Sequence, residues 1–106
     1  MALYIMLSTL SETGRQVVRK LPASIRKDND EVGRMGVRVV AQYAVLGPYD
    51  FVTVLEAPDN ETVAKVSMEL GARGSVQMMT MPAIPVDTFI SRLSGRRSRP
   101  GLRRKR

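Results

Sequence analysis

The sequence predicts an α+β fold of the ferredoxin-like type, in which two helical regions cover one face of a four-stranded antiparallel sheet. Segments rich in alternating or β-branched apolar residues are separated by segments with a helical apolar period, in the order βαββαβ. The chain has 106 residues, of which 43% are hydrophobic and 25% charged, so it accommodates a single globular domain.

The N-terminal segment, Ala2–Leu10, is predicted as a strand with apolar side chains on both faces, since neither alternating set is consistently polar. A helix is expected after Ser11, whose hydroxyl is suited to cap its first turn. Pro22 lacks an amide hydrogen and predicts a break in this helix. The apolar period continues beyond the break as far as Gly36, which is suited to end the helical region.

The rest of the chain predicts three more strands, a second helix and a short terminal helix. The second helix is expected to begin after Asp59, an N-cap, and to end at Gly71. Pro82 and Pro85 are expected to end the fourth strand. The predicted elements other than the second helix are strands at Val37–Leu46, Tyr49–Ala57 and Ser75–Met81 and the terminal helix at Val86–Leu93.

The net charge of +7 comes entirely from the C-terminal segment. Of the seventeen basic residues seven lie in residues 94–106, and the other ten are balanced by ten acidic residues in residues 1–93. Residues 94–106 contain no acidic residue and no apolar period, which predicts a disordered basic tail after a neutral domain of residues 1–93. Its candidate polyanion-binding side chains are Arg96, Arg97, Arg99, Arg103, Arg104, Lys105 and Arg106.

Several classes of site are excluded by composition. The chain has no cysteine and no histidine, which excludes disulfides, Ser-His and Cys-His nucleophiles and the usual zinc sites. No carboxylates have metal-ligand spacing and no glycine-rich phosphate loop is present, so we expect no metal and no cofactor. The longest apolar stretch, Ala2–Leu7, is far shorter than the roughly 20 residues that span a bilayer, and a cytoplasmic location is expected. Whether the chain is an enzyme stays open.

The predicted function depends on the open face of the predicted sheet. A half-exposed antiparallel sheet normally alternates apolar and charged residues, but here the strands carry few charges on either face. We therefore expect two copies to pack these faces together into an α/β barrel, as a homodimer or a higher even oligomer. A small organic molecule is expected in the space between the sheets, and its candidate binding residues are Tyr49, Asp50, Tyr4, Tyr43, Gln42 and Gln77.

Tyr49 and Asp50 are the sharpest pair among these candidates. A phenol and a carboxylate beside a turn could exchange a proton with a bound molecule. In the alternative, Asp50 accepts hydrogen bonds from backbone amides of the turn and Tyr49 packs at the strand end. Packing at the interface is likewise the alternative for the other four candidates.

Three motifs together resemble the GYD domain family over residues 1–93: Gly47-Pro48-Tyr49-Asp50, Ala57-Pro58-Asp59-Asn60 and Pro82-Ala83-Ile84-Pro85. The segments Tyr4-Ile5-Met6-Leu7 and Met35-Gly36-Val37 also fit this family. The resemblance implies a small bacterial or archaeal domain similar to the dimeric α/β-barrel group, which includes monooxygenases, haem-degrading enzymes and small-molecule-binding proteins. It implies no particular reaction, and it does not extend to the basic tail.

A nucleic-acid-associated binding domain is the alternative function, and a structural oligomer without a ligand is a third. RNA-recognition motifs share the βαββαβ order and stack bases on aromatic residues of the first and third strands. Residues 49–52 and 3–5 resemble parts of their two signatures, and the arginine-rich tail could bind phosphates. The acidic Asp50 and the neutral charge of residues 1–93 weigh against this alternative.

Deletion of residues 94–106 is expected to abolish binding to duplex DNA, RNA and anionic vesicles, because the cations that release counterions are lost. For the full chain, the slope of log affinity against log salt on duplex DNA should be no steeper than about −6. Fluorescence anisotropy across a salt series measures both quantities. The shortened chain should keep its melting temperature and oligomeric state, and base-specific binding by it would instead favour the RNA-recognition alternative.

Overall fold

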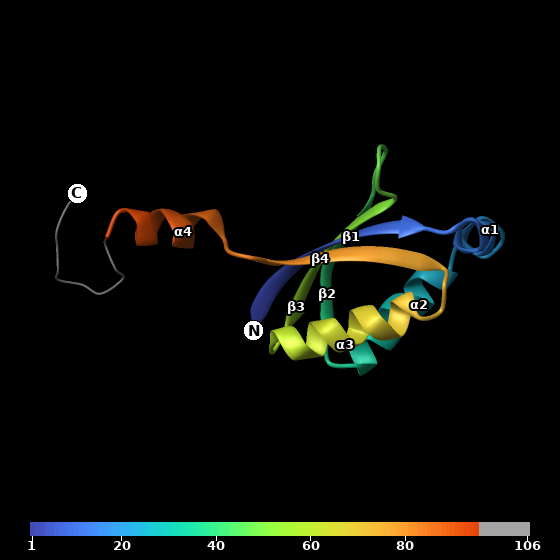
Figure 1. The fold of residues 1–106 in the computed structure, drawn as a ribbon, viewed down its shortest axis with the longest axis horizontal. Helices are drawn as coiled ribbons and strands as arrows, with labels where there is room; N and C mark the ends of the chain where they lie inside the picture. Colours follow the sequence, from blue (N-terminus) through green and yellow to red (C-terminus); the bar gives the residue numbers. More distant parts are fainter. Residues whose placement is uncertain (96–106) are drawn as a thin grey trace.

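Four strands form one antiparallel sheet in the order β2-β3-β1-β4, which confirms the predicted ferredoxin-like fold. The computed structural model describes residues 1–95 (Figure 1). The central strands are β1 (Ala2–Leu10) and β3 (Phe51–Ala57), and the edge strands are β2 (Arg38–Ala44) and β4 (Val76–Ala83).

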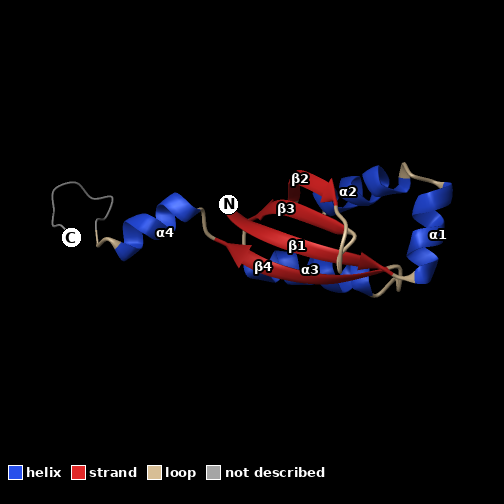
Figure 2. Ribbon diagram, turned by 90° about the horizontal axis from the view of Figure 1, so that it is seen from above, coloured by secondary structure: helices blue, strands red, loops and turns tan. Residues whose placement is uncertain are grey.

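Three helices belong to the body of the domain, and a fourth lies outside it. The α2 and α3 helices cover the same face of the sheet, whereas α1 stands across one end of it (Figures 1 and 2). The α4 helix projects away from the domain beyond the end of β4. Their bounds are α1 Glu12–Lys20, α2 Ser24–Arg34, α3 Asn60–Gly71 and α4 Val86–Leu93.

The predicted helix boundaries are set by the expected local interactions. The Ser11 hydroxyl accepts a hydrogen bond from the Gly14 amide at 3.0 Å, and Asp59 Oδ1 accepts one from the Thr62 amide at 2.8 Å. Helical structure is interrupted around Pro22, as predicted. Gly36 follows α2 with a φ of 94°, a left-handed conformation that glycine adopts without a steric penalty.

The predicted end of the fourth strand is wrong. Pro82 lies inside β4, which runs on to Ala83. Because β4 is an edge strand, a proline there is tolerated where its nitrogen faces away from the neighbouring strand. The end of α3 at Gly71 agrees with the prediction, and the left-handed conformation that follows the helix occurs at Gly74, with a φ of 77°.

The core lies between the sheet and the α2 and α3 helices. Tyr4 and Met6 of β1 point into it, together with Leu55 of β3. Tyr4 is only 2% exposed, and its hydroxyl donates a hydrogen bond to Asn60 Oδ1 at 2.6 Å, which ties the start of α3 to the central strand. The remaining buried apolar residues are Val32, Val37, Ala57, Val63 and Val66.

The α1 helix is attached to the start of β4 through a residue without a side chain. The Ser11 amide donates to the Ser75 carbonyl at 3.0 Å, and Gly14 packs against the same carbonyl. A Cβ atom at Gly14 would lie 2.1 Å from the Ser75 oxygen, so any larger residue must displace α1 or the backbone of Ser75.

Gly14→Ala is expected to lower the free energy of unfolding by about 2 kcal/mol through this overlap. The matched change Gly33→Ala, in α2, meets no atom within 4 Å and should stabilise the protein by about 0.5 kcal/mol or more. Urea unfolding monitored by circular dichroism measures both values. Effects of the same sign for the two variants would contradict the proposed attachment of α1.

Candidate functional site

The face of the sheet opposite the helices is apolar and open to solvent. Across it, Leu7 lies between Val52 and Met79 in the strand register. The larger side chains at its edges are well exposed, with Tyr43 at 58% and Met79 at 52%. By register this open face carries Leu3, Ile5, Leu7, Thr9, Ala41, Tyr43, Val52, Val54, Gln77, Met79 and Met81, together with Arg38 and Glu56 at one end.

The open face carries no net charge. Arg38 and Glu56 are the only ionised side chains in the four strands, and they form an ion pair at 3.1 Å. They lie opposite each other on neighbouring strands. This pair is neutral as a unit, so no electrostatic repulsion opposes the approach of a second copy over the apolar part of the face.

Two further apolar surfaces lie beside the open face. The loop of residues 45–50 projects from the sheet on the side away from α2 and α3 (Figure 1), and its Leu46 is fully exposed. The α4 helix has an apolar stripe at positions i, i+3, i+4 and i+7 that no other element of residues 1–95 covers. The side chains of this stripe, all about half exposed or more, are Val86, Phe89, Ile90 and Leu93.

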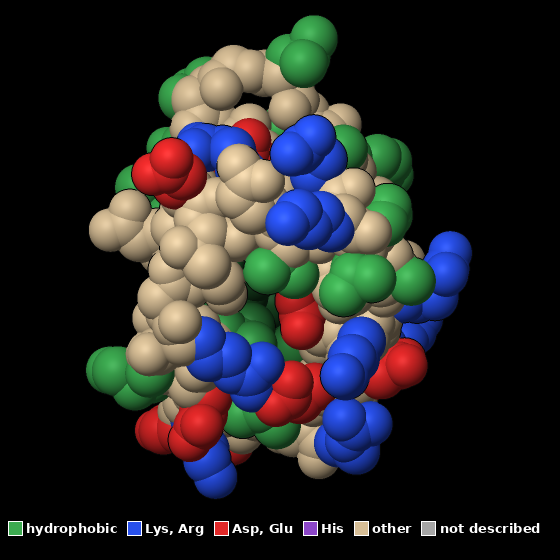
Figure 3. Space-filling model, turned by 90° about the vertical axis from the view of Figure 1, so that its right-hand side faces the viewer, with side chains coloured by type: hydrophobic (Ala, Val, Ile, Leu, Met, Phe, Trp, Pro, Cys, Tyr) green, Lys and Arg blue, Asp and Glu red, His purple; other side chains and the backbone are tan. Residues whose placement is uncertain are grey.

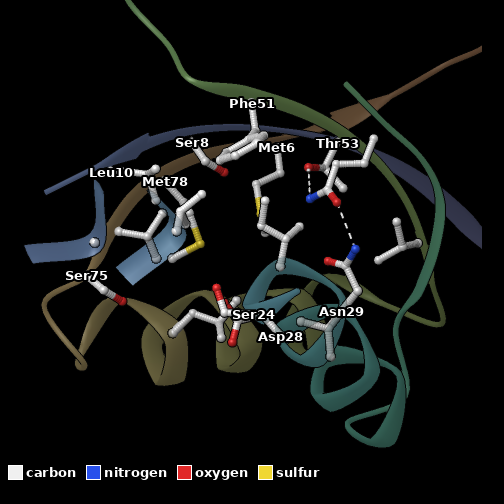
Figure 4. A pocket seen from close by; sticks show the side chains of 18 of the residues that line it. Met6, Ser8, Leu10, Ser24, Asp28, Asn29, Phe51, Thr53, Ser75 and Met78 are labelled. Carbon is white, nitrogen blue, oxygen red and sulfur yellow. Dashed lines mark hydrogen bonds between the residues drawn. The ribbon is translucent and has the colours of Figure 1, made fainter. Parts of the chain in front are cut away.

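On the other side of the sheet, a cavity of about 230 Å³ lies between β1, β3 and the α1 and α2 helices. Figure 4 shows the sheet above it, contributing Met6, Ser8, Phe51 and Thr53, and α2 below it. Most of the lining is apolar, and the apolar residues beyond those labelled in Figure 4 are Val17, Val18, Ile25, Val32, Val39, Leu55, Leu70 and Val76.

A chain of hydrogen bonds forms one wall of the cavity. Asn29 Nδ2 donates to Gln42 Oε1 at 2.7 Å, and Gln42 Nε2 donates to Thr53 Oγ1 at 3.1 Å (Figure 4). These bonds fix the orientation of the Gln42 amide and leave the Thr53 hydroxyl hydrogen free to donate. Thr53 is only 3% exposed, so this donor faces the interior of the domain.

Ser8 contributes a second buried hydroxyl. The residue is 6% exposed, its oxygen points into the cavity in Figure 4, and within residues 1–95 its side chain makes no hydrogen bond to protein. A buried hydroxyl without a partner is unfavourable, so polar side chains at such positions are normally satisfied by protein, water or ligand.

The cavity opens to the surface near the end of the domain where α1 lies, and Figure 3 shows apolar atoms at the bottom of a hollow with charged side chains around it. Asp28 and Arg73 are the charged residues of its lining. Arg73 donates two hydrogen bonds to the Glu31 carboxylate, which lower the pKa of Glu31 and raise that of Arg73. The charge of Arg73 is therefore already compensated.

Asp28 has a different environment. Partial burial raises the pKa of its carboxyl group above the ordinary value of 3.8, and the negative charge of Glu31 acts in the same direction. Arg73 and Lys27 oppose this rise without cancelling it. Within the described residues the Asp28 carboxylate makes no hydrogen bond or ion pair, so a negative charge stands at the mouth of the cavity without a direct partner.

The six predicted ligand-binding residues fall on different sides of the sheet. Tyr43 and Gln77 lie on the open face, as expected. Tyr4 and Gln42 lie on the helix-covered side, Tyr4 under α3 and Gln42 in the cavity wall, so neither can face a second sheet. The strand pattern could not decide this, because both alternating sets of β1 are largely apolar.

Asp50 joins three segments of backbone. Its Oδ2 accepts a hydrogen bond from the Leu10 amide at 2.8 Å, its own amide donates to the Ser8 carbonyl, and its carbonyl accepts from Val45. The carboxylate of Asp50 thus accepts a backbone hydrogen bond, as in the alternative in which this residue has a structural role. The donor, however, is the Leu10 amide at the end of β1 and not an amide of the turn. Tyr49 lies half-buried in the loop before β3. A ligand-binding role for either residue stays a prediction.

The aromatic residues on which the RNA-recognition alternative depends do not lie on the open face. Tyr4 and Phe51 point to the helix-covered side, and Tyr49 precedes β3. Tyr43 is the one aromatic residue that the described strands place on the open face. The seven basic residues of the tail lie outside the described residues.

Ser8, Asp28, Asn29 and Thr53 were not predicted as site residues. Ser8 and Thr53 are polar residues within mainly apolar alternating sets of the central strands, but the sequence does not show that these sets face the helices. Asp28 and Asn29 had no signal in the sequence, since polar residues on a helix are normally solvated. No group of three acidic residues within residues 1–95 could hold a metal ion, and no helix there has the length and hydropathy to cross a bilayer.

Comparisons with known proteins agree on the fold and the family. A family model described as GYD domain matches residues 4–93. A relative from Thermus thermophilus, named glutamine synthetase and cystathionine beta-lyase binding protein, is 54% identical over 94 residues, which are 88% of this chain and 99% of the relative.

Two solved structures share the fold. MtbAldR superposes with a TM-score of 0.61 and 21% identity, over 79% of this chain and 52% of its own, so the chain spans about half the length of that protein. TTHA0845 from Thermus thermophilus superposes with a TM-score of 0.53 and 18% identity, over 80% of this chain and 95% of its own. At these identities the two structures support the fold alone.

Asp28→Asn is expected to stabilise the protein near neutral pH. Because the folded state raises the pKa of Asp28, ionisation of this group costs stability as pH rises from 3.8 through the folded value. The gain in melting temperature over the parent should therefore be largest at pH 7 and vanish in acid below that window. Asp30→Asn, on the same helix, controls for the loss of one negative charge, and an equal gain from it would contradict the assignment.

Proposed function

Because the chain belongs to the GYD domain family, we propose that it is a small homo-oligomeric domain that binds other proteins, using the open face of its sheet for self-association. The observation that carries this proposal is the apolar, uncharged surface of that face. Contiguous apolar surface of this kind on a soluble protein marks an interaction site.

The geometry of the open face favours a second copy as its first occupant. The face has no net charge. In a twofold arrangement, Arg38 of one copy can lie near Glu56 of the other, so the face is complementary to itself. The exposed loop of residues 45–50 projects on the same side of the sheet as the open face, and α4 lies beyond the end of β4, so both could add to the surface that a second copy buries. A stable interface buries about 800 Å² on each partner.

Enzymes are the proposed partners of the assembled protein. The Thermus relative is named for binding glutamine synthetase and cystathionine beta-lyase, and this chain matches nearly its whole length at 54% identity. We extend that binding role to this chain and propose that the bound enzymes carry out the catalysis. The proposed role would use the oligomer, in which the outer surfaces of α2 and α3 remain available after the sheet faces are covered.

A small organic molecule between two sheets remains a second proposal. On the open face, Thr9 and Gln77 form a polar cross-strand pair, and Tyr43 supplies a phenol. These groups could line a partly polar space once a second copy encloses it. Nucleic-acid association through the basic tail and a cytoplasmic location also stay predictions.

Met79→Glu tests self-association through the open face. A carboxylate placed beside Leu7 and Val52 would have to be buried against a second sheet, so the variant is expected to sediment as a monomer where the parent forms a dimer or higher even oligomer. The matched control is Met68→Glu on α3, a 74% exposed methionine on the helix-covered side, which should leave the oligomer intact.

Surface plasmon resonance against immobilised glutamine synthetase and cystathionine beta-lyase tests the enzyme partners. We expect the parent to bind at least one of them, and Met79→Glu to bind more than about tenfold more weakly, because the oligomer is lost. A parent protein that sediments as a monomer at tens of micromolar would overturn self-association. Failure of both enzymes to bind the parent would overturn the partner assignment.

A further inference from the structure

We propose that the cavity between the sheet and the α1 and α2 helices binds a small primary amine with an aromatic or aliphatic body. This site lies on the opposite side of the sheet from the interface proposed above, and it does not depend on that interface. The proposal rests on the size of the cavity, on a buried hydroxyl without a protein partner and on the charge at the mouth.

The cavity selects a ligand with an apolar body. Its volume of about 230 Å³ exceeds the roughly 150 Å³ that accommodates benzene in a protein interior, so it suits one ring with a short substituent, about ten non-hydrogen atoms. The interior lining combines branched aliphatic side chains with Phe51 and two methionines, Met6 and Met78. Methionine adapts its shape to different apolar ligands and also contacts aromatic rings favourably.

The deep end of the cavity offers hydrogen bonds to an uncharged polar group. The Ser8 hydroxyl points into the cavity without a protein partner in residues 1–95, and Thr53 has a free hydroxyl hydrogen. Both residues are more than nine-tenths buried. Thr53 Oγ1 already accepts a hydrogen bond from Gln42, whereas the Ser8 hydroxyl is costly unless a ligand or water satisfies it. A ligand with a hydroxyl group at its far end would meet this need.

The mouth of the cavity selects a positive charge. Asp28 is an exposed residue whose carboxylate has no direct partner within residues 1–95, while Arg73, the only cationic group that these residues contribute to the lining, is already paired with Glu31. An anionic ligand would meet Asp28 without an available cation. An ammonium group would instead pair with Asp28, and the two ends of the site would together hold an amine at the mouth and a hydroxyl inside.

The probe for this site is tyramine, which has a ring, a phenol hydroxyl and an ammonium group. Two analogues test its ends: phenethylamine lacks the hydroxyl, and phloretate carries a carboxylate in place of the ammonium. Isothermal titration of the full chain is expected to give affinity in the order tyramine, phenethylamine, phloretate. Phloretate binding as tightly as tyramine would overturn the proposal.

Two variants test which residue binds each end of the ligand. Asp28→Asn should weaken tyramine binding by at least about tenfold, whereas Asp30→Asn on the same helix should leave it unchanged. Ser8→Ala should weaken tyramine binding and leave phenethylamine binding unchanged, because only tyramine has the hydroxyl. Tyramine affinity that is equal in the parent and in both cavity variants would place the amine elsewhere and overturn the site.

The methionine side chains distinguish this site from the open face. In spectra of methyl-labelled methionine, tyramine should shift the signals of Met6 and Met78, which line the cavity, and leave Met68 on the surface of α3 unaffected. Shifts confined to Met79 and Met81 would move the ligand to the open face, and the absence of any shift would overturn binding. Met79→Glu should still bind tyramine, because the substitution lies on the open face and not in the cavity. A result that contradicts self-association therefore differs from a result that contradicts ligand binding in the cavity.

Discussion

The central strand β1 has apolar side chains on both of its faces, whereas helices cover the sheet on one side only. Tyr4 and Met6 enter the core beneath α2 and α3, while Ile5 and Leu7 stay on the open face. The hydrophobic effect then favours a cover for the open face, because each large apolar side chain left in water forgoes about 1.5–3 kcal/mol of burial. The α2 and α3 helices cannot supply that cover, since both lie on the other side of the sheet.

Local signals in the sequence sufficed for the helices but not for the orientation of the strands. Ser11, Pro22 and Asp59 each act through atoms within a few residues, and the helix boundaries they predict agree with the structure. The orientation of β1 is set instead by contacts between distant parts of the chain, such as the hydrogen bond between Tyr4 and Asn60, which are 56 residues apart. Because β1 is apolar on both faces, alternation alone predicts a strand there without saying which face meets the helices.

The cavity could not be predicted from the sequence, for a related reason. Its polar wall joins Asn29 of α2, Gln42 of β2 and Thr53 of β3, and no spacing along the chain relates these three residues. The same strands nevertheless serve both proposed sites. Ser8 faces the cavity and Leu7, its neighbour in β1, faces the open side, so a shift of this strand by one residue would exchange the two surfaces.

Pro82 has a consequence for how copies of this protein can assemble. It lies in β4, whose outer edge has no neighbouring strand within the described chain. An unpaired edge normally offers a row of amide hydrogens to which another strand can add, and repeated addition produces fibres. A proline interrupts that row, which disfavours continuous growth along the edge. Contacts between two sheet faces form a closed dimer to which no further copy needs to add. With growth along the β4 edge disfavoured, association therefore favours closed oligomers over fibres.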